Sequence, residues 1–127
     1  MLLLPAALRI LLAAEPIDLR RGIDGLMALV QGGWKEDVYG GALFVFVSRR
    51  RDRVKILTWD NGGFVVFYKR LEAGRFRVPT ADDNDGALRI DATQLAMLLD
   101  GIDVRWVKRP SAWMPQRNKI LDAIPQR

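Results

Sequence analysis

Residues Ala42–Pro79 read ALFVFVSRRRDRVKILTWDNGGFVVFYKRLEAGRFRVP, and this stretch decides the fold. Its three apolar runs are rich in Val, Ile, Phe and Trp, the residue types that favour strands. Asn61-Gly62 separates the last two runs and is a strong hairpin signal, because both central residues of a type I′ turn need positive φ. The stretch therefore predicts an antiparallel three-stranded meander, with strands at Leu43–Val47, Arg53–Trp59 and Phe64–Lys69.

The expected turns fix which strand residues face each other. Turns on Arg50-Arg51 and on Asn61-Gly62 place Lys55 opposite both Phe46 and Tyr68. Side chains alternate along a strand, so the sheet has two faces. The face that resembles a core carries Leu43, Val45, Val47, Val54, Ile56, Val65 and Phe67. The second face carries Phe44, Phe46, Leu57, Trp59, Phe64, Val66 and Tyr68, with Arg53, Lys55 and Arg70 at one end. Because both faces are apolar, helices, barrel curvature or a second subunit must cover them.

The flanking sequence predicts further short elements. A buried strand is expected around Leu8–Leu12, and Asp18 is expected to be the N-cap of a helix with the apolar stripe Ile23, Leu26, Met27 and Val30. The other expected elements are short strands at Arg75–Val78 and Leu88–Ile90, and a helix at Ala92–Leu99 capped by Asp91. The predicted fold is therefore α+β: an antiparallel sheet, made of the meander and one to three short strands, packed with two main helices. We expect one domain over residues 1–103, followed by a basic, Pro-containing arm over residues 104–127.

Positive charge is concentrated in two regions of the chain. The net charge is +5. Residues 49–77 hold nine basic and three acidic side chains, and residues 104–127 hold six and one. Basic regions on an otherwise balanced domain indicate a polyanionic partner, whereas the simpler interpretation is a solvated face.

The composition excludes several kinds of chemistry. The chain has no Cys and no His, which removes thiol nucleophiles, imidazole bases and Cys/His zinc sites. Asp82, Asp83 and Asp85 are close together, but their spacing lacks the closing Glu of a calcium loop. Met1–Ala14 is interrupted by Pro5 and Arg9 and is too short to span a bilayer. We therefore expect no catalytic residues, no metal, no cofactor and no membrane partner, and a cytoplasmic protein.

Nucleic-acid binding is the best supported interaction. Three consecutive arginines on a hairpin turn can pair with phosphate oxygens, and further cations lie near the same end of the sheet. The expected DNA-binding residues are Arg49, Arg50, Arg51, Arg53, Lys55, Lys69, Arg70, Arg75 and Arg77. The aromatic residues of the second face are the expected partner-binding set, as a protein interface or as a platform for unpaired bases, unless a helix covers them as core. These residues are Phe44, Phe46, Trp59, Phe64 and Tyr68.

Seven segments of the chain match a known family in order, from about Pro5 to Val104. They are Asp18–Leu26, Gly41–Phe46, Arg49–Leu57, Trp59-Asp60, Tyr68–Glu72, Gly74–Phe76 and Leu95–Asp103. Together they resemble the TnpB accessory proteins (Orf2) of bacterial insertion sequence family 66. Ser48 and Thr58 depart from the pattern, where a glycine and an aromatic residue are expected.

The resemblance implies an accessory role in transposition, alongside a separate and larger transposase that carries the catalytic carboxylates. The first hypothesis is a non-catalytic factor that binds DNA at the element ends through the arginine-rich hairpin. The second is an adaptor that docks the transposase or forms a homo-oligomer, without direct DNA contact. The third is a metal-dependent nuclease that uses Asp82, Asp83 or Asp85.

Overall fold

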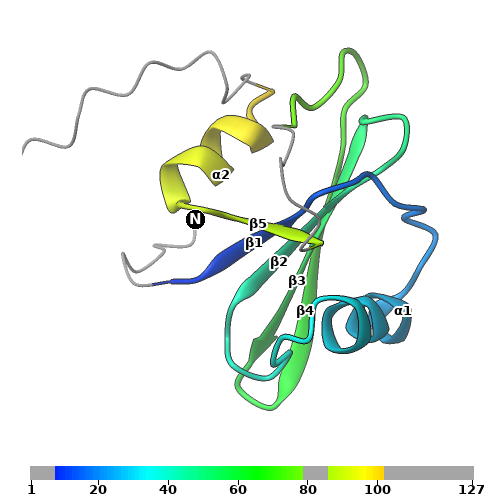
Figure 1. The fold of residues 1–127 in the computed structure, drawn as a ribbon. Helices are drawn as coiled ribbons and strands as arrows, with labels where there is room; N and C mark the ends of the chain where they lie inside the picture. Colours follow the sequence, from blue (N-terminus) through cyan, green and yellow to red (C-terminus); the bar gives the residue numbers. More distant parts are fainter. Residues whose placement is uncertain (1–7, 79–85, 102–127) are drawn as a thin grey trace, which may run out of the picture.

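The computed structural model describes residues 8–78 and 86–101. These residues form a five-stranded mixed sheet with one helix on each face (Figure 1). The strand order is β4-β3-β2-β1-β5, and the α+β class is confirmed. In chain order the elements are β1 (Ile10–Ala13), α1 (Ile23–Ala28) with a π-helical turn η1 (Leu29–Gly33), β2 (Leu43–Val47), β3 (Arg53–Asp60), β4 (Gly63–Arg70), β5 (Ala87–Ile90) and α2 (Ala92–Leu99).

The three central strands have the register that the sequence predicts. Val47 pairs with Val54, Phe46 with Lys55, and Lys55 in turn with Tyr68. At the second hairpin Asp60 pairs with Gly63, so the turn consists of two residues, Asn61 and Gly62, which have φ of 44° and 86°. The register therefore follows from the turn chemistry and the alternating apolar pattern.

The sheet is mixed, which corrects the expectation of an antiparallel sheet. β1 runs parallel to β2 and antiparallel to β5. A parallel pair needs a long crossover, and α1 lies in the connection between β1 and β2. The sequence predicts the strand near Leu8–Leu12 but gives no signal for its partner. Arg75–Val78, a second expected strand, has no regular secondary structure.

Each sheet face packs against one helix. On one side α2 contributes Leu95 and Leu98 to a core with Val45, Val54 and Ile56. On the other side α1 contributes Leu26, and η1 contributes Val30, to a core that includes Phe44, Phe46 and Leu57. α2 begins with a capping box, in which Gln94 N donates to Asp91 Oδ1 at 2.8 Å and Asp91 N donates to Gln94 Oε1 at 2.9 Å. The two helices therefore cover the centre of the apolar sheet on both faces, whereas β4 is partly exposed.

Gly62 is the glycine on which the second hairpin depends. Its φ of 86° lies in the left-handed region, whereas Gly63, the next residue, has no positive φ. No atom lies within 4 Å of a Cβ added at either position, so the two glycines differ in backbone conformation. We expect Gly62→Ala to lower the free energy of unfolding by about 1–2 kcal/mol, and Gly63→Ala to change it by about 0.5 kcal/mol or less. Thermal melts of both variants test this, and equal losses would contradict it.

Candidate functional site

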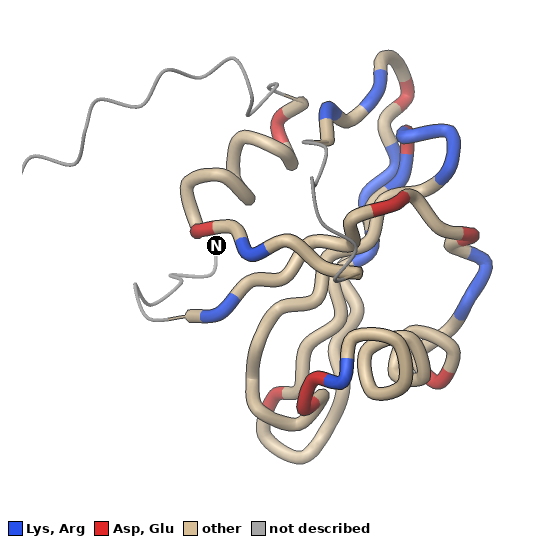
Figure 2. Tube along the Cα trace, in the orientation of Figure 1, with Lys and Arg blue, Asp and Glu red and all other residues tan. Residues whose placement is uncertain are grey.

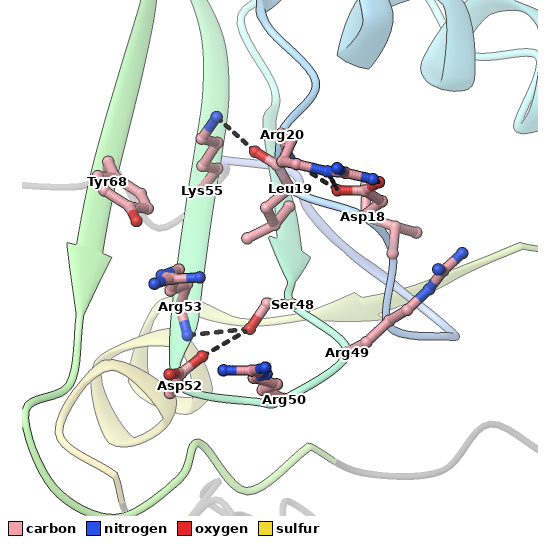
Figure 3. Close-up of a pocket in the computed structure, with 11 residues that line it drawn as sticks. Asp18, Leu19, Arg20, Ser48, Arg49, Arg50, Asp52, Arg53, Lys55 and Tyr68 are labelled. Atoms are coloured by element: carbon pink, nitrogen blue, oxygen red, sulfur yellow. Dashed lines mark hydrogen bonds and ion pairs between the residues drawn. The ribbon is translucent and has the colours of Figure 1, made fainter.

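An open pocket of about 830 Å³ lies at the end of the sheet that carries the first hairpin (Figure 3). Three parts of the chain form its walls. The loop at residues 17–20 forms one wall, the turn between β2 and β3 forms the second, and side chains of β3 and β4 form the third. Ile17 N donates to the Val47 carbonyl at 3.0 Å, which fixes the loop beside the turn. The pocket is thus built on a paired strand end.

The turn between β2 and β3 is ordered by a small hydrogen-bond network. Arg51 N donates to the Ser48 carbonyl at 2.8 Å, and Arg51 has φ of 61°. Ser48 Oγ accepts from Arg53 N at 3.1 Å and donates to Asp52 Oδ1 at 3.2 Å. The buried Ser48 side chain therefore ties both ends of the turn together (Figure 3). Arg49 and Arg50 are exposed on the outer part of this turn.

Lys55 joins the loop wall to the sheet. Its Nζ donates to the carbonyls of Leu19 at 2.7 Å and Arg21 at 3.0 Å. The same ammonium lies 5.6 Å from the ring centroid of Tyr68 on β4, a cation–π distance. Two of the three donors of the Lys55 ammonium are thus satisfied within the protein, and these bonds hold the loop beside β3.

Asp18 and Arg20 form an ion pair on the rim of the pocket. Arg20 Nη2 lies 2.6 Å from Asp18 Oδ2, and Arg20 N donates to Asp18 Oδ1 at 3.0 Å. The Arg20 side-chain hydrogen bonds lower the pKa of the Asp18 carboxyl, and Arg20 N and the nearby Arg49 charge act in the same direction. Asp18 is therefore ionised at neutral pH, and its charge offsets that of Arg20.

Three other guanidinium groups of the pocket have no carboxylate partner within residues 8–78 and 86–101. Arg49, Arg50 and Arg53 line the pocket and make no side-chain hydrogen bond or ion pair with residues 8–78 or 86–101. Arg53 Nε is buried and has no acceptor within that part of the chain. A buried donor without an acceptor costs free energy until a ligand or water satisfies it. The pocket therefore presents unpaired positive charge to an anion.

Comparison with known proteins places the chain in a family. The family model described as IS66 Orf2 like protein (TnpB_IS66) matches residues 8–109. The chain belongs to the IS66 Orf2-like family. It is 39% identical over 110 residues to "Uncharacterized protein y4jC" of Sinorhizobium fredii (strain NBRC 101917 / NGR234), covering 87% of this chain and 92% of that protein. It is 37% identical over 109 residues to "Uncharacterized protein y4hO" of the same organism, covering 86% and 91%. No solved structure matches the chain.

Membership of the IS66 Orf2-like family indicates that this chain is a transposition-associated accessory protein. The resemblance found in the seven sequence segments is thus confirmed.

Within residues 8–78 and 86–101 there is no group of three or more carboxylates placed to hold a metal ion, and no helix is long and apolar enough to cross a membrane. Asp82, Asp83 and Asp85 lie outside the described residues, as does the expected basic arm at residues 104–127.

The predicted basic set of this IS66 Orf2-like chain gathers at one end of the sheet, as Figure 2 shows around the first hairpin and the adjoining chain. Leu71 N donates to the Asp52 carbonyl at 2.7 Å, and Phe76 N donates to the Arg51 carbonyl at 2.6 Å. These two bonds hold the segment at residues 71–78 beside the turn. Exposed Arg75 and Arg77 consequently lie near the arginine-rich turn, although no strand forms there.

Besides Lys55, two further members of the predicted basic set have structural partners. Lys69 lies on the α2 side of β4, and its Nζ donates to the Leu99 carbonyl at 2.7 Å, where a cation interacts favourably with the helix end. Arg70 is paired with Glu72 at 2.9 Å, and this hydrogen-bonded contact raises the pKa of Arg70. Lys69 therefore does not line the pocket, and Arg70 contributes little net charge to it.

The predicted partner-binding aromatics do not form one surface. Phe44 and Phe46 are fully buried in the α1-side core, and Phe46 stacks on Trp34 with ring centroids 5.1 Å apart. They were expected as a partner-binding surface unless a helix covered them as core, and for these two residues the structure shows the core alternative. The rings of Trp59 and Phe64 pack together near the second hairpin, with centroids 4.9 Å apart. This pair lies at the end of β3 and β4 opposite to the pocket. Tyr68 is half exposed and lines the pocket.

The sequence did not identify the loop wall as part of the site. Asp18 was expected to be a helix N-cap, but α1 begins at Ile23 with Gly22 as its N-cap and no side-chain cap. Asp18 instead accepts a hydrogen bond from the amide of Arg20, two residues later, in the manner of an Asx turn. The alternation of Asp18 with Arg20 is the signal that could have suggested this local pairing.

Proposed function

We propose that this protein is a non-catalytic accessory factor of transposition that binds DNA phosphates in the basic pocket. The observation that carries the proposal is the set of three guanidinium groups without partners, Arg49, Arg50 and Arg53, on the walls of one open pocket. Guanidinium groups pair bidentately with phosphate oxygens. Membership of a transposition-associated family supports DNA as the source of those phosphates.

The surrounding charges support a contact with an extended anion. Arg51, Arg75 and Arg77 are exposed beside the pocket and can meet neighbouring phosphates of the same strand. The proposed site is therefore smaller than the set expected from the sequence, because Lys55 and Lys69 are bound to backbone carbonyls. In this proposal the protein acts in the bacterial cytoplasm, at the element ends, with the transposase of the same element.

The test is a salt titration of DNA binding. Fluorescence anisotropy would follow a labelled duplex from the element end and a scrambled duplex, with and without the transposase. We expect affinity for both duplexes to fall steeply as salt rises, because each phosphate contact releases condensed counterions. No binding at low ionic strength would contradict the proposal. Binding only when the transposase is present would favour the adaptor alternative.

A further inference from the structure

Within the described part of the chain, β4 is an edge strand with one free side. There β4 pairs with β3 alone, and it extends over eight residues, Gly63–Arg70 (Figure 1). Natural proteins usually protect such an edge with charges, prolines, bulges or a covering segment. The centre of β4, residues 64–68, reads FVVFY and contains no charge and no proline. This edge therefore has none of the usual sequence protection over five residues.

The hydrogen-bond pattern identifies the backbone groups that face outward. Ser48 N donates to the Arg53 carbonyl at 2.9 Å, so the backbone of Arg53 faces β2. Antiparallel pairs alternate between hydrogen-bonded and non-hydrogen-bonded positions. The backbone N–H and C=O groups of the next residue, Val54, and of every second residue after it therefore point towards β4. The register then places the outward backbone N–H and C=O groups of β4 at Phe64, Val66, Tyr68 and, at the strand end, Arg70. Within residues 8–78 and 86–101 no strand pairs with this side of β4.

Apolar side chains flank the free edge on both faces. Val65 is 48% exposed and Phe67 is 47% exposed on the α2 side, and Tyr68 is 51% exposed on the α1 side. Exposed β-branched and aromatic side chains next to unpaired backbone groups are the features used in β-augmentation, where backbone bonds give affinity and side chains give specificity.

We infer that β4 pairs antiparallel with β4 of a second copy of this chain, about a two-fold axis at Val66. Alternation requires an outward-facing residue to meet an outward-facing residue, and Val66 is the central one of those in the uncharged stretch 64–68. This register matches Val65 with the partner's Phe67 and Phe64 with the partner's Tyr68. It places Lys69 and Arg70 opposite the partner's Gly63 and Gly62.

Charge and side-chain size favour this register over the one with its axis at Phe67. A two-fold axis at Phe67 would place Lys69 opposite the partner's Val65 and Arg70 opposite the partner's Phe64, so two cations would adjoin apolar side chains. The register at Val66 keeps five apolar pairs together and leaves each cation opposite a glycine. The edge is therefore complementary to itself, which is the requirement for a two-fold interface.

The dimer would place both basic pockets on one face. Opposed residues of paired strands share a face, so Tyr68 and the α1 side of each copy point the same way. With a rise of about 3.3 Å per residue and strands about 4.8 Å apart, the two Arg53 positions are roughly 30 Å apart. That spacing is close to one turn of B-DNA, about 34 Å. This consequence rests on the proposed DNA binding, whereas the dimer itself does not.

Cross-linking tests the interface without DNA. The chain has no cysteine, so a single introduced cysteine reports on one position. At the two-fold axis the paired Cα atoms would be about 5.5 Å apart, within the range that a disulfide spans. We expect the full chain to have twice the monomer mass in light scattering, and Val66→Cys to form a disulfide-linked dimer under mild oxidation. Glu72→Cys, which is exposed and away from the axis, is the matched control and should not cross-link.

A second pair of substitutions blocks the edge. Val65→Lys with Phe67→Lys places charge at half-exposed positions, so the core under α1 is left intact and like charges meet across the seam. We expect loss of the dimer with an unchanged circular dichroism spectrum. A monomeric wild-type chain, or a Val66→Cys variant that cross-links no better than Glu72→Cys, would overturn the inference whatever the DNA titration gives. A dimer that persists in the double lysine variant with its fold intact would also overturn it.

Discussion

Replacing Phe46 by Ala is expected to lower the free energy of unfolding by about 3–5 kcal/mol, the cost typical of a large buried aromatic residue. Phe46 is fully buried between the sheet and α1, with its ring 5.1 Å from that of Trp34. Truncation removes this burial and leaves a cavity beneath the helix, which the surrounding backbone can close only in part. Chemical denaturation of wild type and variant, followed by circular dichroism, measures the difference.

Tyr68→Ala is the matched control, because Tyr68 lies on the same sheet face but is 51% exposed. We expect this substitution to cost about 1 kcal/mol or less. A Phe46→Ala variant as stable as Tyr68→Ala would show that Phe46 is not part of the core. The comparison therefore separates the buried position seen in the structure from the partner surface that the sequence also allowed.

The sequence predicted the central strands and their register because local chemistry determines them. The Asn61-Gly62 turn requires positive φ, and the alternating apolar residues then allow one register that buries both faces. α2 was predicted to the residue, Ala92–Leu99, because Asp91 is a strong N-cap signal, and the structure shows Asp91 in a capping box with Gln94.

The sequence could not predict features that depend on contacts distant in the chain. The parallel pairing of β1 with β2 is one, because the pattern of a buried strand is the same for either direction. Whether Phe44 and Phe46 were core or interface is another, since a strand pattern does not show where α1 packs. For the site, the arginine-rich turn was found from sequence. The loop wall was missed, because Lys55 reaches Leu19 across 36 positions of the chain.

Removing the two outermost arginines of the pocket, by Arg49→Ala with Arg50→Ala, is expected to weaken DNA binding by roughly a hundredfold. A hydrogen bond to a charged group contributes about 1.5–3 kcal/mol, and 1.4 kcal/mol corresponds to tenfold in affinity. Both residues are exposed and make no hydrogen bond within residues 8–78 and 86–101, so the fold should not depend on them. Arg51 is left in place because it does not line the pocket. Anisotropy titrations at several salt concentrations measure affinity and salt slope together.

The matched control is Arg9→Ala with Arg89→Ala, which removes the same charge from the β1–β5 side of the sheet. Arg9 pairs with Glu36 at 3.1 Å in an exposed contact, and such surface pairs contribute little to stability. If phosphates bind in the pocket, the pocket variant should reduce the slope of log affinity against log salt by about one unit per lost contact, for the element end and the scrambled duplex alike. Equal weakening by both double variants would instead show that total charge, and not the pocket, determines binding. We expect the two double variants to differ in DNA affinity because Arg49, Arg50 and Arg53 line one pocket and can bind the same phosphates. Arg9, in contrast, already has a carboxylate partner.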